Sequence, residues 1–208
     1  MNFIKYCFFL ILTGLTGMHG MAQGKLPAKH YVSAGAGFPN LPRLYFNSVS
    51  NSLENFEASG SGPFHLKYEN RVSRWFGVGA SVNYMSYKVT YISERAFDTA
   101  AGRIVPNHVN ISSSNTAINL RGNVHFINPE KHGKVDVYFG IGLGYKFGKP
   151  KLTATVPEST PSIELPAYTN IGFETTFGFR YYIQDHVGFY TELGVAKSVI
   201  QAGATVRW

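Results

Sequence analysis

The chain of 208 residues has few charged residues and almost no cysteine. Asp, Glu, Lys and Arg make up 15% of it, against roughly a quarter in an ordinary soluble domain. Its one cysteine, Cys7, lies in an N-terminal apolar stretch, so the rest of the chain has no thiol chemistry or disulfide. The 19 Lys and Arg residues are scattered and form no basic run, so we expect no nucleic-acid partner despite a formal net charge of +7.

Long apolar runs are also missing, except for one at the N-terminus. It follows a cation at Lys5 and leads to small residues at Gly20 and Ala22, which are spaced like a cleavage site. The run is about a dozen residues long, whereas a membrane-spanning helix needs roughly 20. We therefore predict a signal peptide over residues 1–22, export through the secretory pathway, and a single mature domain over residues 23–208.

The rest of the sequence alternates between apolar and polar residues with period two. From residue 135 to 147 every odd position is apolar, and a similar pattern runs from 169 to 183. Helical periodicity fails in both segments. Weaker copies complete a set of eight predicted strands, at residues 31–38, 64–71, 76–91, 116–127, 187–196 and 199–208.

Long and short connections take turns between these strands. The long ones, rich in Ser, Asn, Pro and Thr, are residues 39–63, 92–115 and 149–167. Short turns separate them. In an up-and-down barrel with both termini on one side, all three long loops then lie on the opposite side, as in outer-membrane barrels.

Side-chain size indicates which face of such a barrel points outward. Eight strands enclose only enough room for side chains, so the face that carries bulky groups such as Phe139 and Phe177 belongs outside. We predict an all-β fold, an eight-stranded antiparallel up-and-down transmembrane β-barrel. Aromatic residues near both strand ends, with Tyr84, Tyr87 and Tyr91 at the long-loop end, are expected to form two interfacial belts.

The predicted third strand changes its apolar face along its length. Even positions are apolar up to Tyr84, and odd positions are apolar from Tyr87 onward. A bulge, or the membrane boundary near residues 84–86, would explain the change.

Charges of both signs follow the polar face, on which His65 and His125 are also expected. Enclosed in a barrel, these charges have to pair, because an unpaired buried charge costs several kcal/mol. We predict an interior polar network with a structural and not a catalytic role. Its predicted members are Lys67, Glu69, Arg121, Asp136, Lys146, Glu174, Arg180 and Glu192.

The final strand carries a further pattern. Gln201, Gly203, Val206 and Trp208 supply a polar residue, a glycine, and two spaced hydrophobic residues of which the last is aromatic. With the signal peptide, the eight strands and the three long loops, the sequence resembles the small outer-membrane β-barrel proteins of the OmpA/OmpX type, whose C-terminal strand is an assembly signal. The family pattern more often ends in Phe than in Trp.

The resemblance implies a place in the outer membrane of a Gram-negative bacterium. The implied partners are outer-membrane lipid and, during biogenesis, the outer-membrane assembly machinery. An extracellular ligand that binds the loops is a further candidate partner. No cofactor is predicted, and no residues have metal-ligand spacing.

Three classes of function remain open. A non-enzymatic barrel that supports the envelope, or that recognises and adheres to a surface through its three long loops, is favoured. A lipid-modifying enzyme needs a Ser, a His and an acid together at the membrane face, and no histidine is predicted at a lipid-facing strand position, so no catalytic residue is assigned. A narrow porin-like channel needs a wider lumen than eight strands leave, and a soluble carrier needs the bulky face inside.

Overall fold

The computed structural model describes most of the predicted mature domain. The predicted signal peptide, residues 1–22, lies outside the described residues. Among the residues that the structure describes, no helix is both long and apolar enough to cross a membrane. The described residues are 29–41, 44–45, 54–98, 102–127, 134–148, 150–156, 170–195 and 198–208.

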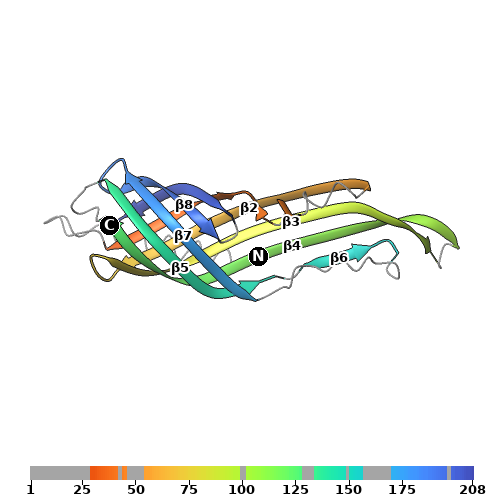
Figure 1. Ribbon diagram of the computed structural model, residues 1–208, viewed down its shortest axis with the longest axis horizontal. Helices are drawn as coiled ribbons and strands as arrows, with labels where there is room; N and C mark the ends of the chain where they lie inside the picture. The colour runs from red at the N-terminus through yellow and green to blue at the C-terminus, as the bar shows by residue number, and fades with distance from the viewer. Residues whose placement is uncertain are drawn as a thin grey trace.

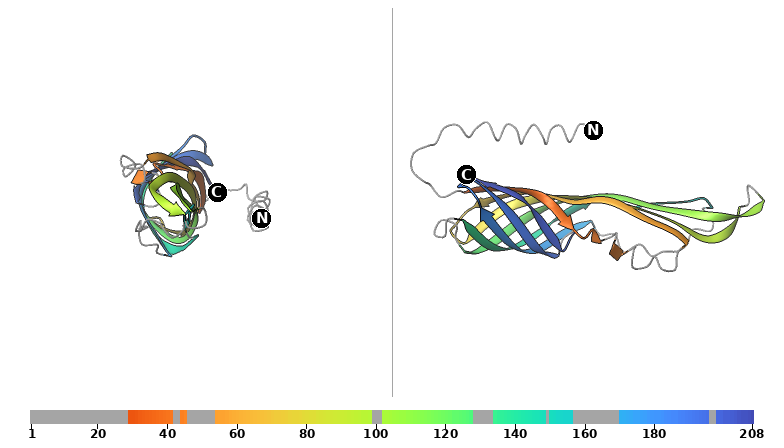
Figure 2. Two further views of the ribbon diagram at one scale, coloured as in Figure 1. Left: turned by 90° about the vertical axis from the view of Figure 1, so that its right-hand side faces the viewer. Right: turned by 90° about the horizontal axis from the view of Figure 1, so that it is seen from above.

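Eight antiparallel strands close into a barrel. Figures 1 and 2 show the cylinder from three directions. The strands are β1 His30–Phe38, β2 Glu54–Arg71, β3 Phe76–Asp98, β4 Arg103–Ile127, β5 Val135–Phe147, β7 Ile171–Tyr182, β8 Val187–Val195 and β9 Ile200–Arg207, and the short β6 Lys151–Ala154 pairs with β4 alone. Pairing of β1 with β9 closes the cylinder. Closure matters in lipid, because no water is present there to satisfy a free strand edge. The predicted eight-stranded antiparallel barrel is confirmed.

Three strands are longer than the sequence pattern predicted. β3 and β4 have 23 and 25 residues, and they pair as far as Asp98 and Arg103. The prediction of residues 92–115 as a loop was therefore wrong, and β2 and β6 likewise take up parts of 39–63 and 149–167. Beyond the membrane these strands are rich in Ser, Thr and Asn, a composition that is typical of loops. In Figure 2 they project from one end of the barrel.

The two faces of the barrel strands differ as expected. Leu120 and Phe177 are 77% and 50% exposed on the outer face, where lipid covers them. Their neighbours in sequence, Arg121 and Thr176, are buried in the lumen. Bulky apolar groups thus face the membrane, and polar groups fill the interior.

Beyond the barrel, the same strands exchange the polarity of their faces. On β4 the outward position Ser112 is polar, whereas the inward positions Val109 and Ile111 are apolar and fully buried. The β3–β4 register runs through this level without a shift, with Tyr84 opposite Thr116. A bulge in this pair therefore does not cause the exchange, and the membrane boundary explains it: lipid selects apolar groups on the outside, and water selects polar ones.

An irregularity on the neighbouring strand lies at the same level. The register of β2 against β3 shifts between Ser61 and Phe64. Gly62, inside this shift, has a φ of 78°, a left-handed conformation that suits glycine. The shift therefore lies where β2 leaves the barrel.

Two aromatic residues are not part of an interfacial belt, contrary to expectation. Tyr91 is 2% exposed in a small apolar cluster, and Tyr87 is half-buried against that cluster. Both side chains point inward above the membrane boundary. Tyr84 and Tyr145, by contrast, are exposed on the outer face at the loop end of the barrel, and Trp75 is exposed at the short-turn end.

The exchange of faces predicts opposite effects for one substitution at two positions of β4. Leu120→Arg places a charge in the middle of the lipid-facing surface and should lower the free energy of unfolding by about 2–4 kcal/mol. Ser112→Arg, on the same face in water, should change it by less than about 0.5 kcal/mol. Urea titration of the protein in lipid vesicles, followed by tryptophan fluorescence, measures both. An unchanged midpoint for Leu120→Arg would mean that the faces are reversed.

Candidate functional site

One cluster of ion pairs crosses the lumen around Glu192. Its carboxylate lies 2.6 Å from the Lys67 ammonium and 2.9 Å from the Arg121 guanidinium. The Tyr138 hydroxyl donates a 2.6 Å hydrogen bond to the same carboxylate. Arg121 also reaches Glu174, at 3.2 Å. These residues come from five different strands, so the cluster ties opposite walls of the barrel together.

A second cluster lies nearer the short-turn end. Arg180 bridges two carboxylates, Glu69 at 2.7 Å and Asp136 at 3.1 Å, and Arg71 adds a 3.1 Å contact to Asp136. The His125 ring lies between the same two acids, with Nε2 2.6 Å from Glu69 and Nδ1 2.8 Å from Asp136. Because an ionised carboxylate only accepts hydrogen bonds, this arrangement is satisfied when both ring nitrogens carry a proton.

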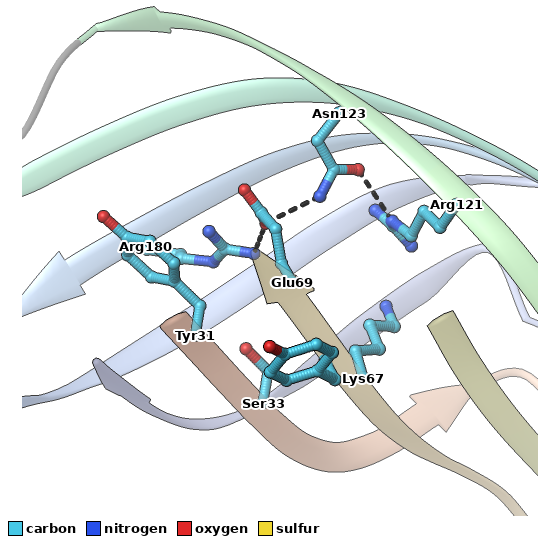
Figure 3. A pocket seen from close by; sticks show the side chains of 8 residues that line it. Tyr31, Ser33, Lys67, Glu69, Arg121, Asn123 and Arg180 are labelled. Atoms are coloured by element: carbon cyan, nitrogen blue, oxygen red, sulfur yellow. Dashed lines mark hydrogen bonds and ion pairs between the residues drawn. The ribbon is translucent and has the colours of Figure 1, made fainter. Parts of the chain in front are cut away.

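Asn123 joins the two clusters. Its side-chain oxygen accepts a 2.8 Å hydrogen bond from Nε of Arg121, and its nitrogen donates one of 2.6 Å to Glu69, as Figure 3 shows. The Arg180 guanidinium stacks over the Tyr138 ring, with its central carbon 4.2 Å from the ring centroid. Four carboxylates and four Lys or Arg side chains are buried among the described residues, so these charges balance before His125 is counted.

Seven of the eight residues predicted for the interior network lie in these two clusters. The eighth, Lys146, is only partly buried, near the loop end of β5, whereas the four buried carboxylates contact Lys67, Arg71, Arg121 and Arg180. Sequence reasoning missed Arg71, Tyr138 and Asn123. All three occupy inward positions in the strand alternation, which was the available signal.

A hydrogen-bonded chain leads from the network to the last extracellular hairpin. The Asn83 amide nitrogen donates to Glu174, at 3.2 Å, so its oxygen faces Nδ1 of His65, at 2.6 Å. Nδ1 therefore donates, and Nε2 is left to accept from the Ser198 hydroxyl, 3.4 Å away. The order serine, histidine, amide is that of an activated nucleophile. However, Ser198 is fully buried, which keeps a substrate carbonyl away from its hydroxyl.

The extended strands form a second candidate site, which we call the extracellular sheet: residues 54–61 of β2, 86–98 of β3, 103–114 of β4, and β6. Its inward face has a small apolar core of its own. Burial raises the pKa of the Tyr87 hydroxyl at the edge of this core. The core consists of Val89, Tyr91, Val109 and Ile111, packed against Phe56, Ala58, Tyr87, Leu152 and Ala154.

The outward face of the extracellular sheet is polar and exposed to water. Ser59, Lys88, Ser112 and Lys151 lie side by side across its four strands. Within the described part of the chain, no group of His, Cys, Asp or Glu is arranged to hold a metal ion. The arrangement is that of a sheet with one packed and one free face.

Removal of one carboxylate tests the lumen network. Glu192→Gln leaves Lys67 and Arg121 underpaired and should lower the free energy of unfolding by about 3–5 kcal/mol. The double variant Lys67→Met with Glu192→Leu removes both charges and should recover part of that loss. The control Glu57→Gln, on the exposed face of β2, should cost less than about 0.5 kcal/mol. Equal unfolding midpoints for Glu192→Gln and the control would contradict the network.

Comparison with known proteins identifies the family of this chain. Residues 8–201 match the model of the family described as outer membrane protein beta-barrel domain. The crystal structure of Ail, the attachment invasion locus protein of Yersinia pestis, in complex with the heparin analogue sucrose octasulfate, is similar at 11% identity and a TM-score of 0.36, covering 88% of this chain and 99% of that one. No curated protein matches. The chain belongs to the outer membrane protein beta-barrel domain family and resides in the outer membrane of a Gram-negative bacterium.

Proposed function

We propose that this protein is a non-enzymatic surface-recognition protein, in which the barrel is the anchor and the extracellular sheet presents the binding surface. The observation that carries the proposal is the continuous pairing of β3 with β4 far beyond the membrane. Four residues, 72–75, are enough to connect β2 to β3 on the opposite side of the barrel. Connection alone therefore does not account for so long a projection.

The interior supports an anchoring role for the barrel. Its carboxylates already contact cations within the lumen, and Arg180, Tyr138 and Arg121 stack across it, so the charged groups are engaged in holding the walls. A conducting pore would need these contacts to open. The burial of Ser198 likewise supports a binding function over catalysis.

Shortening the projection tests the proposal. Ser86 and Ser114 are direct partners, so replacement of residues 87–113 by Asn-Gly should close a two-residue hairpin at the membrane boundary. We expect the shortened barrel to remain folded, with a gel mobility that changes only on boiling. Cells that display it should adhere to monolayers of cultured cells at least tenfold less than cells that display the full chain.

A matched control changes the other end of the barrel. Replacement of Gln184-Asp185 by Asn-Gly, in the β7–β8 turn, should leave adherence unchanged. Equal adherence of the shortened and full-length proteins would overturn the recognition proposal. Increased detergent sensitivity of the shortened strain without a change in adherence would favour the envelope-supporting alternative.

A further inference from the structure

The far end of the β3–β4 hairpin presents two large apolar side chains to water. Phe97 is 57% exposed and Ile104 is 67% exposed. They are direct partners across the hairpin, so they share one face. The outward face nearer the membrane carries Lys88 and Ser112, both polar. An apolar pair at the tip of a polar surface needs an explanation other than folding.

A register shift sets the orientation of this pair. Ile92 lies opposite His108, but Arg95 lies opposite Pro106, so β3 contains one extra residue between the two pairs. Without it, Ala96 and not Phe97 would lie opposite Ile104. Because successive residues of a strand alternate between faces, the extra residue turns Phe97 to the face of Ile104. The bulge thus creates the apolar pair.

The tip lies too far away to contact the protein's own membrane. Tyr84 is at the membrane boundary, and the strand from Tyr84 to Phe97 spans roughly 44 Å at about 3.4 Å per residue. Figure 1 shows this hairpin leading away from the barrel along the long axis of the molecule. Whatever covers the pair therefore belongs to another surface.

The formal charge of the tip segment, taken from its sequence, favours one kind of surface. Residues 92–108 contain two acidic residues, Glu94 and Asp98, and two basic ones, Arg95 and Arg103, so their formal charges cancel. A segment without net charge has no electrostatic attraction to an anionic surface, and it suits one that is itself neutral overall. A zwitterionic lipid bilayer is such a surface, and its interior accepts apolar side chains.

Building on the recognition function proposed above, we propose that Phe97 and Ile104 insert into a zwitterionic bilayer of a facing cell. Apolar groups of surface-bound proteins enter the boundary between headgroups and acyl chains by about 5–10 Å, a depth that two neighbouring side chains can reach. Pairing of Phe97 with Ile104 satisfies the backbone groups between the two strands, and insertion by side chains alone keeps the outer backbone edges of the hairpin among the hydrated headgroups. One tip binds weakly, and many copies on one cell surface add to the avidity.

Vesicle flotation tests the insertion. The full-length protein in lipid nanodiscs is mixed with phosphatidylcholine vesicles, and the fraction that floats with the vesicles is measured. We expect the double variant Phe97→Ser with Ile104→Ser to reduce partitioning at least tenfold, because serine has no apolar surface to insert. Arg74→Ser, in the exposed turn between β2 and β3 at the opposite end of the barrel, is the matched control and should bind like the unchanged protein. The shift in gel mobility on boiling verifies that each variant is folded.

Four outcomes would overturn the insertion. In the first, the unchanged protein does not float with the vesicles, and in the second, the double variant floats as well as the unchanged protein. In the third, binding requires phosphatidylglycerol and disappears at high salt. In the fourth, nanodiscs that carry the unchanged protein form dimers and those that carry the double variant do not, so that a second copy of the chain is the occupant. If the double variant lowers cell adherence although the unchanged protein binds no vesicles, the tip recognises a protein. In that case insertion fails and the recognition function stands.

Discussion

The narrow lumen of an eight-stranded barrel is the constraint on which the rest of this structure depends. Its width leaves room for side chains and nothing larger, so every inward residue must find both space and a partner. Large polar groups gain space from glycine: a Cβ at Gly140 would collide with Arg121, and one at Gly178 would collide with the Tyr138 ring. The glycines of the polar face therefore provide the space that the charged and aromatic side chains of the lumen occupy.

The balance of charge follows from the same constraint. A single buried carboxylate without a cation would destabilise the barrel, whereas acids shared between several cations hold several strands together. Arg121 contacts both Glu174 and Glu192, and Arg180 contacts both Glu69 and Asp136. The network therefore connects opposite walls of the barrel, which are otherwise joined only by backbone hydrogen bonds between neighbouring strands.

The parts of the fold that the sequence could predict are those in which lipid enforces a strong contrast between faces. Residues 135–147 and 171–182 alternate bulky apolar groups with glycine and charge, and their strands were predicted to within two residues. Above the membrane the contrast reverses and weakens, because water accepts Ser, Thr and Asn equally in strands and in loops. The extension of β4 from Arg103 was missed for that reason.

The network was predictable by face but not by partner. Period two fixes which side chains point inward, and it identified Lys67 and Glu192. It gives neither the height of a residue along the lumen nor its position around the wall, and these two partners are 125 residues apart in sequence. Lys146 shows the same limit, since it faces inward on β5 but lies at a different height from the buried acids.

The continuity of strands across the membrane boundary explains how so long a projection stays ordered. An isolated two-stranded hairpin is at best marginally stable in water, because fixing each residue costs about 1–2 kcal/mol of conformational entropy. Here the register of β3 and β4 is already set inside the barrel, and the core around Val109 and Ile111 supports the first part of the extension. Anchor and projection are thus one structure, and the order of the extracellular sheet depends on the barrel beneath it.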